Sequence, residues 1–77
     1  MKLNLTIEVL VEWLNLSQED VERTVLQFGR QLDISEVQEA VEIARTKFPQ
    51  GGMRGFRYFC GICHRKIEDQ TIRDRLR

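Results

Sequence analysis

The sequence predicts an all-α fold, a small bundle of about four helices with a basic C-terminal helix and tail. Three observations support this prediction. Apolar residues follow helical spacing in four successive segments, two of these segments begin with the same kind of capping signal, and glycine and proline gather mainly between the third segment and the fourth. With 77 residues, 42% hydrophobic and 31% charged, the chain has the composition of a single folded domain.

The first helix is expected to begin near residue 6 and to run to about residue 14. Thr6 is assigned as its N-cap, and Leu5 is positioned to pack on Leu10 as a hydrophobic staple. The expected inner face has helical spacing and consists of Ile7, Leu10, Val11 and Leu14.

The second helix is expected to begin at Ser17, a capping residue with Asp20 three positions later. Leu16, just before the cap, is positioned to staple onto Val21, and Gly29 is a natural end for the helix. The expected inner face consists of Val21, Val25 and Phe28.

The third helix repeats this pattern. Asp33 is the expected N-cap, Glu36 is its capping-box partner, and Leu32 is positioned to staple onto Val37. We therefore interpret the two helix starts as copies of one capping arrangement. The expected inner face consists of Val37, Val41, Ala44 and Phe48.

A loop is expected over residues 49–55, because Pro49 and three glycines lie within it. In the helix that follows, one apolar stripe spans an arc of about 100°, and the flank and back are basic. Residues 68–77 have only Ile72 and Leu76 as apolar anchors, so this tail is expected to be either a fraying helical extension or a mobile basic arm. The predicted stripe is Phe56, Phe59, Cys60, Cys63 and Ile67.

The formal net charge of +0 conceals a strong asymmetry between the two halves of the chain. Residues 1–42 hold three Lys or Arg against nine Asp or Glu, a net charge of −6, whereas residues 43–77 hold nine against three, a net charge of +6. This asymmetry favours a second half that binds a polyanion. The alternative is that the halves neutralise each other across the fold.

The segment Cys60-Gly61-Ile62-Cys63-His64 matches the attachment signature of c-type haem. Haem is disfavoured because no export signal is present, and zinc because a closed site usually takes two ligand pairs from separate segments. A redox role is disfavoured because Cys60 is expected about a turn inside the helix. We predict that both cysteines are buried with His64 at the stripe's edge, without metal or cofactor; zinc shared between two chains remains an alternative.

No catalytic arrangement is recognised in the sequence. His64 is the only histidine and has no identifiable nucleophile and orienting acid with which to form a triad. Neither of the common glycine-rich phosphate-binding motifs is present. The protein is therefore not expected to be an enzyme.

Cations and aromatic rings alternate between Lys47 and Lys66, a mixture that proteins use to contact phosphates and to stack bases. Phe56 and Phe59 are assigned to the core by their spacing. Tyr58 lies about 160° from the centre of the apolar stripe and is the ring expected to be free. The alternative for Tyr58 is packing against a neighbouring helix with its hydroxyl in water.

Short motifs over about two thirds of the chain follow a known pattern. Leu16-Ser17 begins a helix, Glu39-Ala40-Val41-Glu42-Ile43-Ala44 lies in the next long helix, and Phe56-Arg57-Tyr58 is followed by Ile62. In these motifs the chain resembles the C-terminal domain of the DnaD-type primosomal and replication-initiation proteins of Gram-positive bacteria, their phages and plasmids. It departs from the family pattern Y-x-x-x-I-x-x-x-W at the last position, which is Lys66.

The resemblance implies an all-helical module that binds DNA during replication initiation or helicase loading, commonly as part of a larger chain. It points to Tyr58 and Ile62 as DNA-binding residues, with Lys66 as an altered third member. The implied protein partners are a replication initiator or a helicase-loading protein.

The expected function is non-specific binding of single- or double-stranded DNA, mainly through phosphates. The rival function is a protein–protein interaction or oligomerisation module, in which acidic and basic halves of different copies assemble head to tail. No apolar run approaches the about 18 residues of a membrane span, and two cysteines are too few for a disulfide scaffold, so we expect a cytoplasmic protein without membrane contact. The expected DNA-binding residues are Arg54, Arg57, Tyr58, Ile62, Arg65, Lys66, Arg73, Arg75 and Arg77.

Overall fold

The structure, a computed structural model, describes residues 2–75, with the backbone alone at residues 2–4 and 74. The described chain contains four helices and no strand, which confirms the all-α prediction. The tail continues the last helix as far as residue 75, so the helical alternative holds there, and residues 76–77 lie outside the described residues. The helices are α1 (Lys2–Leu14), α2 (Gln18–Gly29), α3 (Ile34–Lys47) and α4 (Gly52–Arg75).

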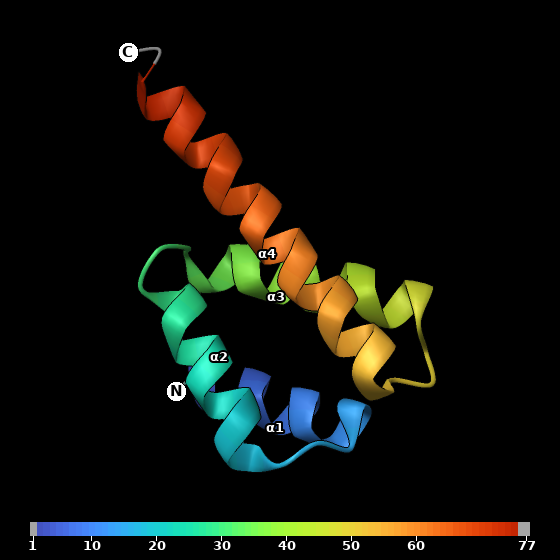
Figure 1. The fold of residues 1–77 in the computed structure, drawn as a ribbon. Helices are drawn as coiled ribbons and strands as arrows, with labels where there is room; N and C mark the ends of the chain where they lie inside the picture. Colours follow the sequence, from blue (N-terminus) through green and yellow to red (C-terminus); the bar gives the residue numbers. More distant parts are fainter. Residues whose placement is uncertain (1, 76–77) are drawn as a thin grey trace.

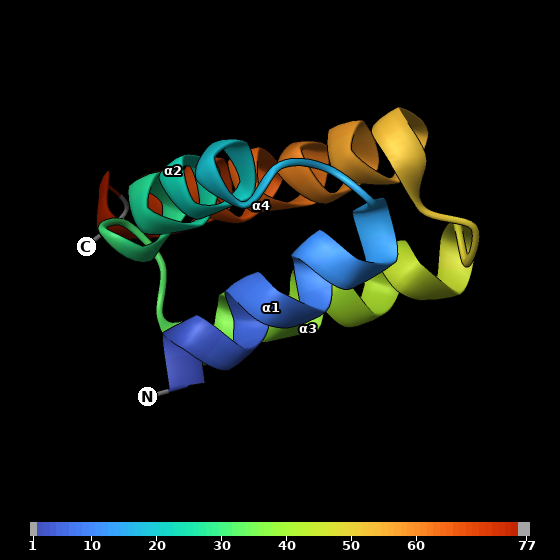
Figure 2. The same cartoon turned by 90° about the horizontal axis from the view of Figure 1, so that it is seen from below.

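In Figure 2 the helices lie at two levels, α1 and α3 at one and α2 and α4 at the other, and the closest packing is between α3 and α4 and between α1 and α2. Successive helices run in opposite directions, the arrangement that short connections permit. Helix α4 crosses α3 obliquely, and its last turns extend beyond the other three helices (Figure 1). Within the part of the chain that the structure describes, no helix is long and apolar enough to cross a membrane.

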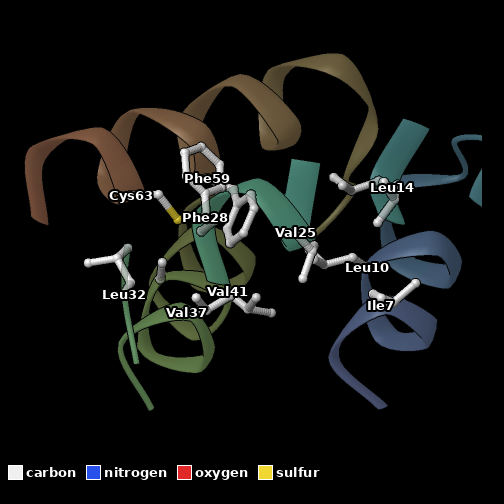
Figure 3. Packing of buried hydrophobic residues seen from close by; sticks show 13 residues of the cluster. Ile7, Leu10, Leu14, Val25, Phe28, Leu32, Val37, Val41, Phe59 and Cys63 are labelled. Atoms are coloured by element: carbon white, nitrogen blue, oxygen red, sulfur yellow. The ribbon is translucent and has the colours of Figure 1, made fainter. Parts of the chain in front are cut away.

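One hydrophobic core joins the four helices, and the predicted inner faces supply it with the exception of Phe48, which follows α3 as its C-cap, is half-buried and does not belong to the core cluster. Phe59 of α4 is fully buried, and its ring meets that of Phe28 edge to face with centroids 6.0 Å apart (Figure 3). Phe56, Cys60 and Ile67 are half-buried and pack against this core, which confirms the predicted stripe. The buried core residues are Ile7, Leu10, Leu14, Val21, Val25, Phe28, Leu32, Val37, Ala40, Val41, Ala44, Phe59 and Cys63.

The two predicted capping arrangements differ in the structure. The Oγ of Ser17 accepts a hydrogen bond from the Asp20 amide at 3.3 Å, as predicted. Asp33 occupies the N-cap position of α3, but its side chain accepts no capping hydrogen bond. Its expected partner Glu36 instead accepts a hydrogen bond from Lys66 of α4. The interpretation of the two starts as copies is therefore wrong for the second. The Glu36 amide donates to the backbone carbonyl of Asp33 at 3.0 Å, and the Glu36 side chain is engaged by Lys66.

The predicted start of the first helix is also wrong. Helix α1 begins at Lys2, about a turn earlier, and Thr6 lies inside it with only 5% of its surface exposed. Leu5 is 62% exposed, so it is not a buried staple on Leu10. Helical spacing places Thr6 next to the inner face, where a residue in the middle of the helix is buried and cannot serve as its N-cap.

The loop before α4 is shorter than predicted, because α4 already begins at Gly52. Gly51 and Gly52 have positive φ angles of 71° and 74°, a conformation that favours glycine and ends the connection. Gly55 lies inside the helix, where a Cβ atom would be 3.0 Å from the ring of Trp13. This third glycine therefore permits close helix packing and does not belong to the loop.

Candidate nucleic-acid interface

Helix α4 has an inner face that builds the core and an outer face that is exposed. Phe59 and Cys63 point into the bundle from the inner face (Figure 3). Because successive residues of a helix are rotated by about 100°, three arginines between the apolar positions lie on the outside of the same turns. These exposed residues are Arg54, Arg57 and Arg65.

Five of the nine predicted DNA-binding residues line one open groove of about 520 Å³ on this outer face. Arg57 and Arg65 supply positive charge, while Tyr58 and Ile62 supply apolar surface. Ile43 of α3, which sequence reasoning did not select, is 41% exposed and lines the same groove. Its exposure beside a basic helix could not be read from the spacing within α3. The complete lining is Ile43, Arg57, Tyr58, Gly61, Ile62, Arg65, Lys66 and Asp69.

Tyr58 is both packed and exposed. Its ring meets the ring of Phe48 at the end of α3 edge to face, with centroids 5.2 Å apart, and 37% of the residue remains exposed. The packing alternative is therefore the better description, although part of the residue remains exposed. Arg54 lies apart from Arg57 and Arg65, in a second groove beside the α3–α4 connection.

Trp13 of α1 contacts both the end of α3 and the start of α4, and the sequence analysis missed it. Its indole Nε1 donates a hydrogen bond to the carbonyl oxygen of Phe48 at 3.0 Å. The indole ring also packs closely on Gly55 near the start of α4, where an added Cβ atom would be only 3.0 Å from the ring. The available signal was the chemistry of a lone tryptophan, since a half-buried indole N–H usually finds an acceptor.

Lys66 differs from the other predicted contacts because its charge is already neutralised within the fold. Its Nζ donates hydrogen bonds to Glu36 Oε2 at 2.7 Å and to Glu39 Oε1 at 2.9 Å, and only 17% of its side chain is exposed. The hydrogen bond from Lys66 lowers the pKa of Glu36, and the bond to Glu36 raises the pKa of Lys66. We therefore remove Lys66 from the candidate phosphate contacts.

Among the described side chains, the acidic half and the basic half of the chain form ion pairs only at Lys66. Both described ion pairs, to Glu36 and to Glu39, involve this residue. Arg54, Arg57 and Arg65 have no carboxylate partner within 4.0 Å in the described part of the chain. The positive charge of the outer face is therefore available to a ligand.

The arginines at the end of α4 are separate from the groove. Arg73 lines a different, polar pocket beside the α2–α3 connection, where its charge contributes to the lowered pKa of Glu36. Arg75 is exposed on the projecting turns of the helix. Arg77, the last predicted contact, lies outside the described residues.

The two cysteines of the motif lie on the core side of α4, Cys63 within the core and Cys60 half-buried against it. Cys63 is fully buried, and burial raises the pKa of its thiol to about 12, so the thiol stays protonated at neutral pH. Burial also raises the pKa of Cys60. The His64 ring is packed edge to face on Phe28, with centroids 5.2 Å apart. In the described part of the chain, no group of three or more potential ligands is placed to hold a metal ion.

No protein-family model matches the chain, and no curated protein and no solved structure matches it. The resemblance to the DnaD-type domain remains a prediction from the motifs quoted above.

Proposed function

We propose that the protein is a non-specific DNA-binding module that contacts phosphates through the outer face of α4. The observation that carries this proposal is the groove in which Arg57 and Arg65 flank Tyr58 and Ile62. Both arginines are exposed and lie outside the described ion pairs, so their guanidinium groups can bind a phosphate without giving up a carboxylate partner.

The composition of the groove suits a nucleic-acid strand. Guanidinium groups bind phosphate oxygens in any sequence context, which gives affinity without base specificity. The partly exposed Tyr58 and the apolar side chains of Ile43 and Ile62 offer contact to a base or a sugar. Arg54 near one end of α4 and Arg73 and Arg75 near the other extend the possible phosphate contacts along the helix axis.

The biological context of this proposal is replication initiation or helicase loading. It rests on the DnaD-type motifs, in which Tyr58 and Ile62 are the matching positions and both line the groove. The acidic exterior of the first three helices is then the surface for a replication initiator or a helicase-loading protein. The position of the family tryptophan is occupied by Lys66, which lines the same groove and forms its two ion pairs with Glu36 and Glu39 of α3.

A matched pair of double variants tests the proposal. Arg57→Ala with Arg65→Ala removes two candidate contacts, whereas Arg23→Ala with Arg30→Ala removes the same charge from exposed positions on α2 and just after it. Binding of fluorescent oligonucleotides, single- and double-stranded, is measured by anisotropy at several salt concentrations. We expect the first pair to lower the magnitude of the salt slope by about 1.4 to 1.8, with an unchanged melting temperature.

Three outcomes would contradict the proposal. The first is that the parent protein binds no oligonucleotide at low salt, and the second is that the α4 double variant binds as tightly as the parent. The third is that the control pair weakens binding as much as the α4 double variant does. The last outcome would mean that net charge alone determines binding and that the groove has no special role.

A second candidate function is association with protein, favoured by the outer face of α1. Leu5 and Val9 are exposed one helical turn apart, and Glu8 and Glu12 lie beside them. Exposed apolar residues with an acidic border suit a basic protein surface, including the basic half of another copy. Sedimentation in the absence of DNA distinguishes the two functions, since self-association that weakens with salt supports this candidate.

A further inference from the structure

Gly61 is a glycine that the fold itself does not require. The three glycines at the start of α4 each have a structural reason: Gly51 and Gly52 adopt positive φ, and Gly55 makes room for Trp13. Gly61 has no positive φ angle, and a Cβ atom added to it would meet nothing within 4 Å. Neither backbone conformation nor internal packing therefore explains this residue.

A glycine in the interior of a helix is unfavourable for stability. It loses more backbone entropy on folding than any other residue and supplies no side chain, so alanine would be preferred at this position. Gly61 lies near the middle of the 24-residue helix α4, so it does not serve as a helix cap. An unfavourable residue with open space around it leaves room for a group from outside the chain to approach the helix backbone.

The position of Gly61 identifies what that occupant contacts. Residues four apart form a row along a helix surface, and Gly61 lies midway in the row between Arg57 and Arg65. The two arginines are eight residues apart, about 12 Å along the axis, and they are exposed. The missing side chain therefore leaves a notch between two cations, and this notch belongs to the groove that Tyr58 and Ile62 also line.

We infer that the notch at Gly61 is a seat for a backbone phosphate of the bound strand, held from both sides by Arg57 and Arg65. This inference rests on the proposed DNA-binding function and deepens it by assigning the point of closest approach. A phosphate over Gly61 can reach the helix surface, so both guanidinium groups meet it at short range. A side chain at this position would keep the phosphate away from at least one of them.

The test compares Gly61→Ala and Gly61→Leu with the parent in two measurements. Melting followed by circular dichroism should show a higher midpoint for Gly61→Ala, by about 4 to 8 °C, because the helix gains propensity and loses no internal contact. Affinity for the same labelled oligonucleotides at low salt should fall by about threefold for alanine and about tenfold for leucine, the equivalent of one charge-assisted hydrogen bond. Stability and binding thus change in opposite directions.

Gln27→Leu, at an exposed position of α2, is the control for added apolar bulk and should leave the affinity unchanged. If the parent binds no oligonucleotide, the proposed function fails and the phosphate seat fails with it. If the parent binds and both Gly61 variants bind as tightly as the parent, the phosphate seat is overturned and the proposed function stands. A lower melting midpoint for Gly61→Ala would also overturn it, since glycine would then have a role inside the fold.

Discussion

The two faces of α4 use the same turns of helix for opposite purposes. The inner face places Phe59 and Cys63 in a core that excludes water, where each side chain touches several others. The outer face places Arg57 and Arg65 in solvent, where no described carboxylate pairs with them. Substitution at the first set changes the free energy of unfolding, whereas substitution at the second set changes the free energy of binding.

This difference shows that residues close in sequence can be tested independently. Phe59 and Tyr58 are neighbours along the chain, yet one is fully buried and the other has more than a third of its surface exposed. Two residues do not fit this separation into a core face and a binding face. Lys66 lines the groove but forms ion pairs with α3, and Trp13 packs at Gly55 but also bonds to Phe48, which contacts Tyr58. The predictions below test how strictly the faces separate and where the separation fails.

The largest expected effect belongs to the inner face. Phe59→Ala should lower the free energy of unfolding by about 3 to 5 kcal/mol, because it leaves a cavity at the centre of the core beside Phe28. Thermal melting should show a midpoint lower by about 15 °C or more. Met53→Ala at an exposed position of α4 is the control. Equal midpoints for Phe59→Ala and the parent would mean that the inner face is misassigned.

The second effect belongs to the outer face. Tyr58→Ala should weaken binding of a single-stranded oligonucleotide by about 1 to 3 kcal/mol if the exposed side of the ring stacks on a base, with little change for duplex. Tyr58→Phe keeps the ring and should bind like the parent. Anisotropy titrations of both variants measure the difference. Equal losses for single strand and duplex would show that Tyr58 acts through the shape of the helix and not through stacking.

The third prediction concerns Trp13, which contacts residues on either side of the α3–α4 connection. Trp13→Phe removes the hydrogen bond to the Phe48 carbonyl and the part of the indole that packs at Gly55. The free energy of unfolding, measured with urea, should fall by about 1 to 2 kcal/mol. Because Phe48 contacts Tyr58, single-strand affinity should also fall, but by less than in Tyr58→Ala. An unchanged urea midpoint would show that the connection is held without Trp13.

The smallest effect is the pH dependence of the ion pairs at Lys66. Lys66 lowers the pKa of Glu36 from its usual value of 4.5, so the folded state binds that proton less readily than the unfolded state. The stabilisation is therefore present above about pH 4.5 and is lost as the pH falls through the lowered pKa. The pKa of Lys66 is raised from 10.5, so the same contact is lost only in strong alkali.

Lys66→Met should therefore cost less than about 1 kcal/mol at pH 7, because both carboxylates are substantially exposed. Urea unfolding at pH 7 and pH 3 should show the difference between parent and variant shrinking at pH 3. Lys47→Met at an exposed position should show no such trend. A difference that stays constant with pH would mean that Lys66 stabilises through its methylene groups alone.

The sequence predicted what depends on neighbours along one helix. The stripe containing Phe59 and Cys63 follows from spacing alone, and Ser17 caps α2 through an amide only three residues away. The grouping of Arg57 with Arg65 also follows, because one helix carries both and their separation determines that they share a side.

Features that need two helices could not be predicted in the same way. Glu36 resembled a capping-box residue until α4 brought Lys66 to it from 30 residues away. Gly55 resembled a loop residue because its packing partner, Trp13, belongs to a helix distant in sequence. Ile43 joined the groove only when α4 crossed α3. In each case the sequence near the residue was compatible with two structural roles, and a contact with a residue distant in sequence determined which role it has.

The projecting end of α4 has a consequence for amide hydrogen exchange. From Glu68 to Arg75 every side chain that the structure describes is exposed, so these turns rely on backbone hydrogen bonds without support from a core. Amides near Phe59 should exchange only when the whole domain unfolds, whereas amides near Ile72 should exchange through local opening of the helix end. A single continuous helix would then contain two independent opening units, and the boundary between them would fall close to Ile67, the last residue of α4 that packs on the core.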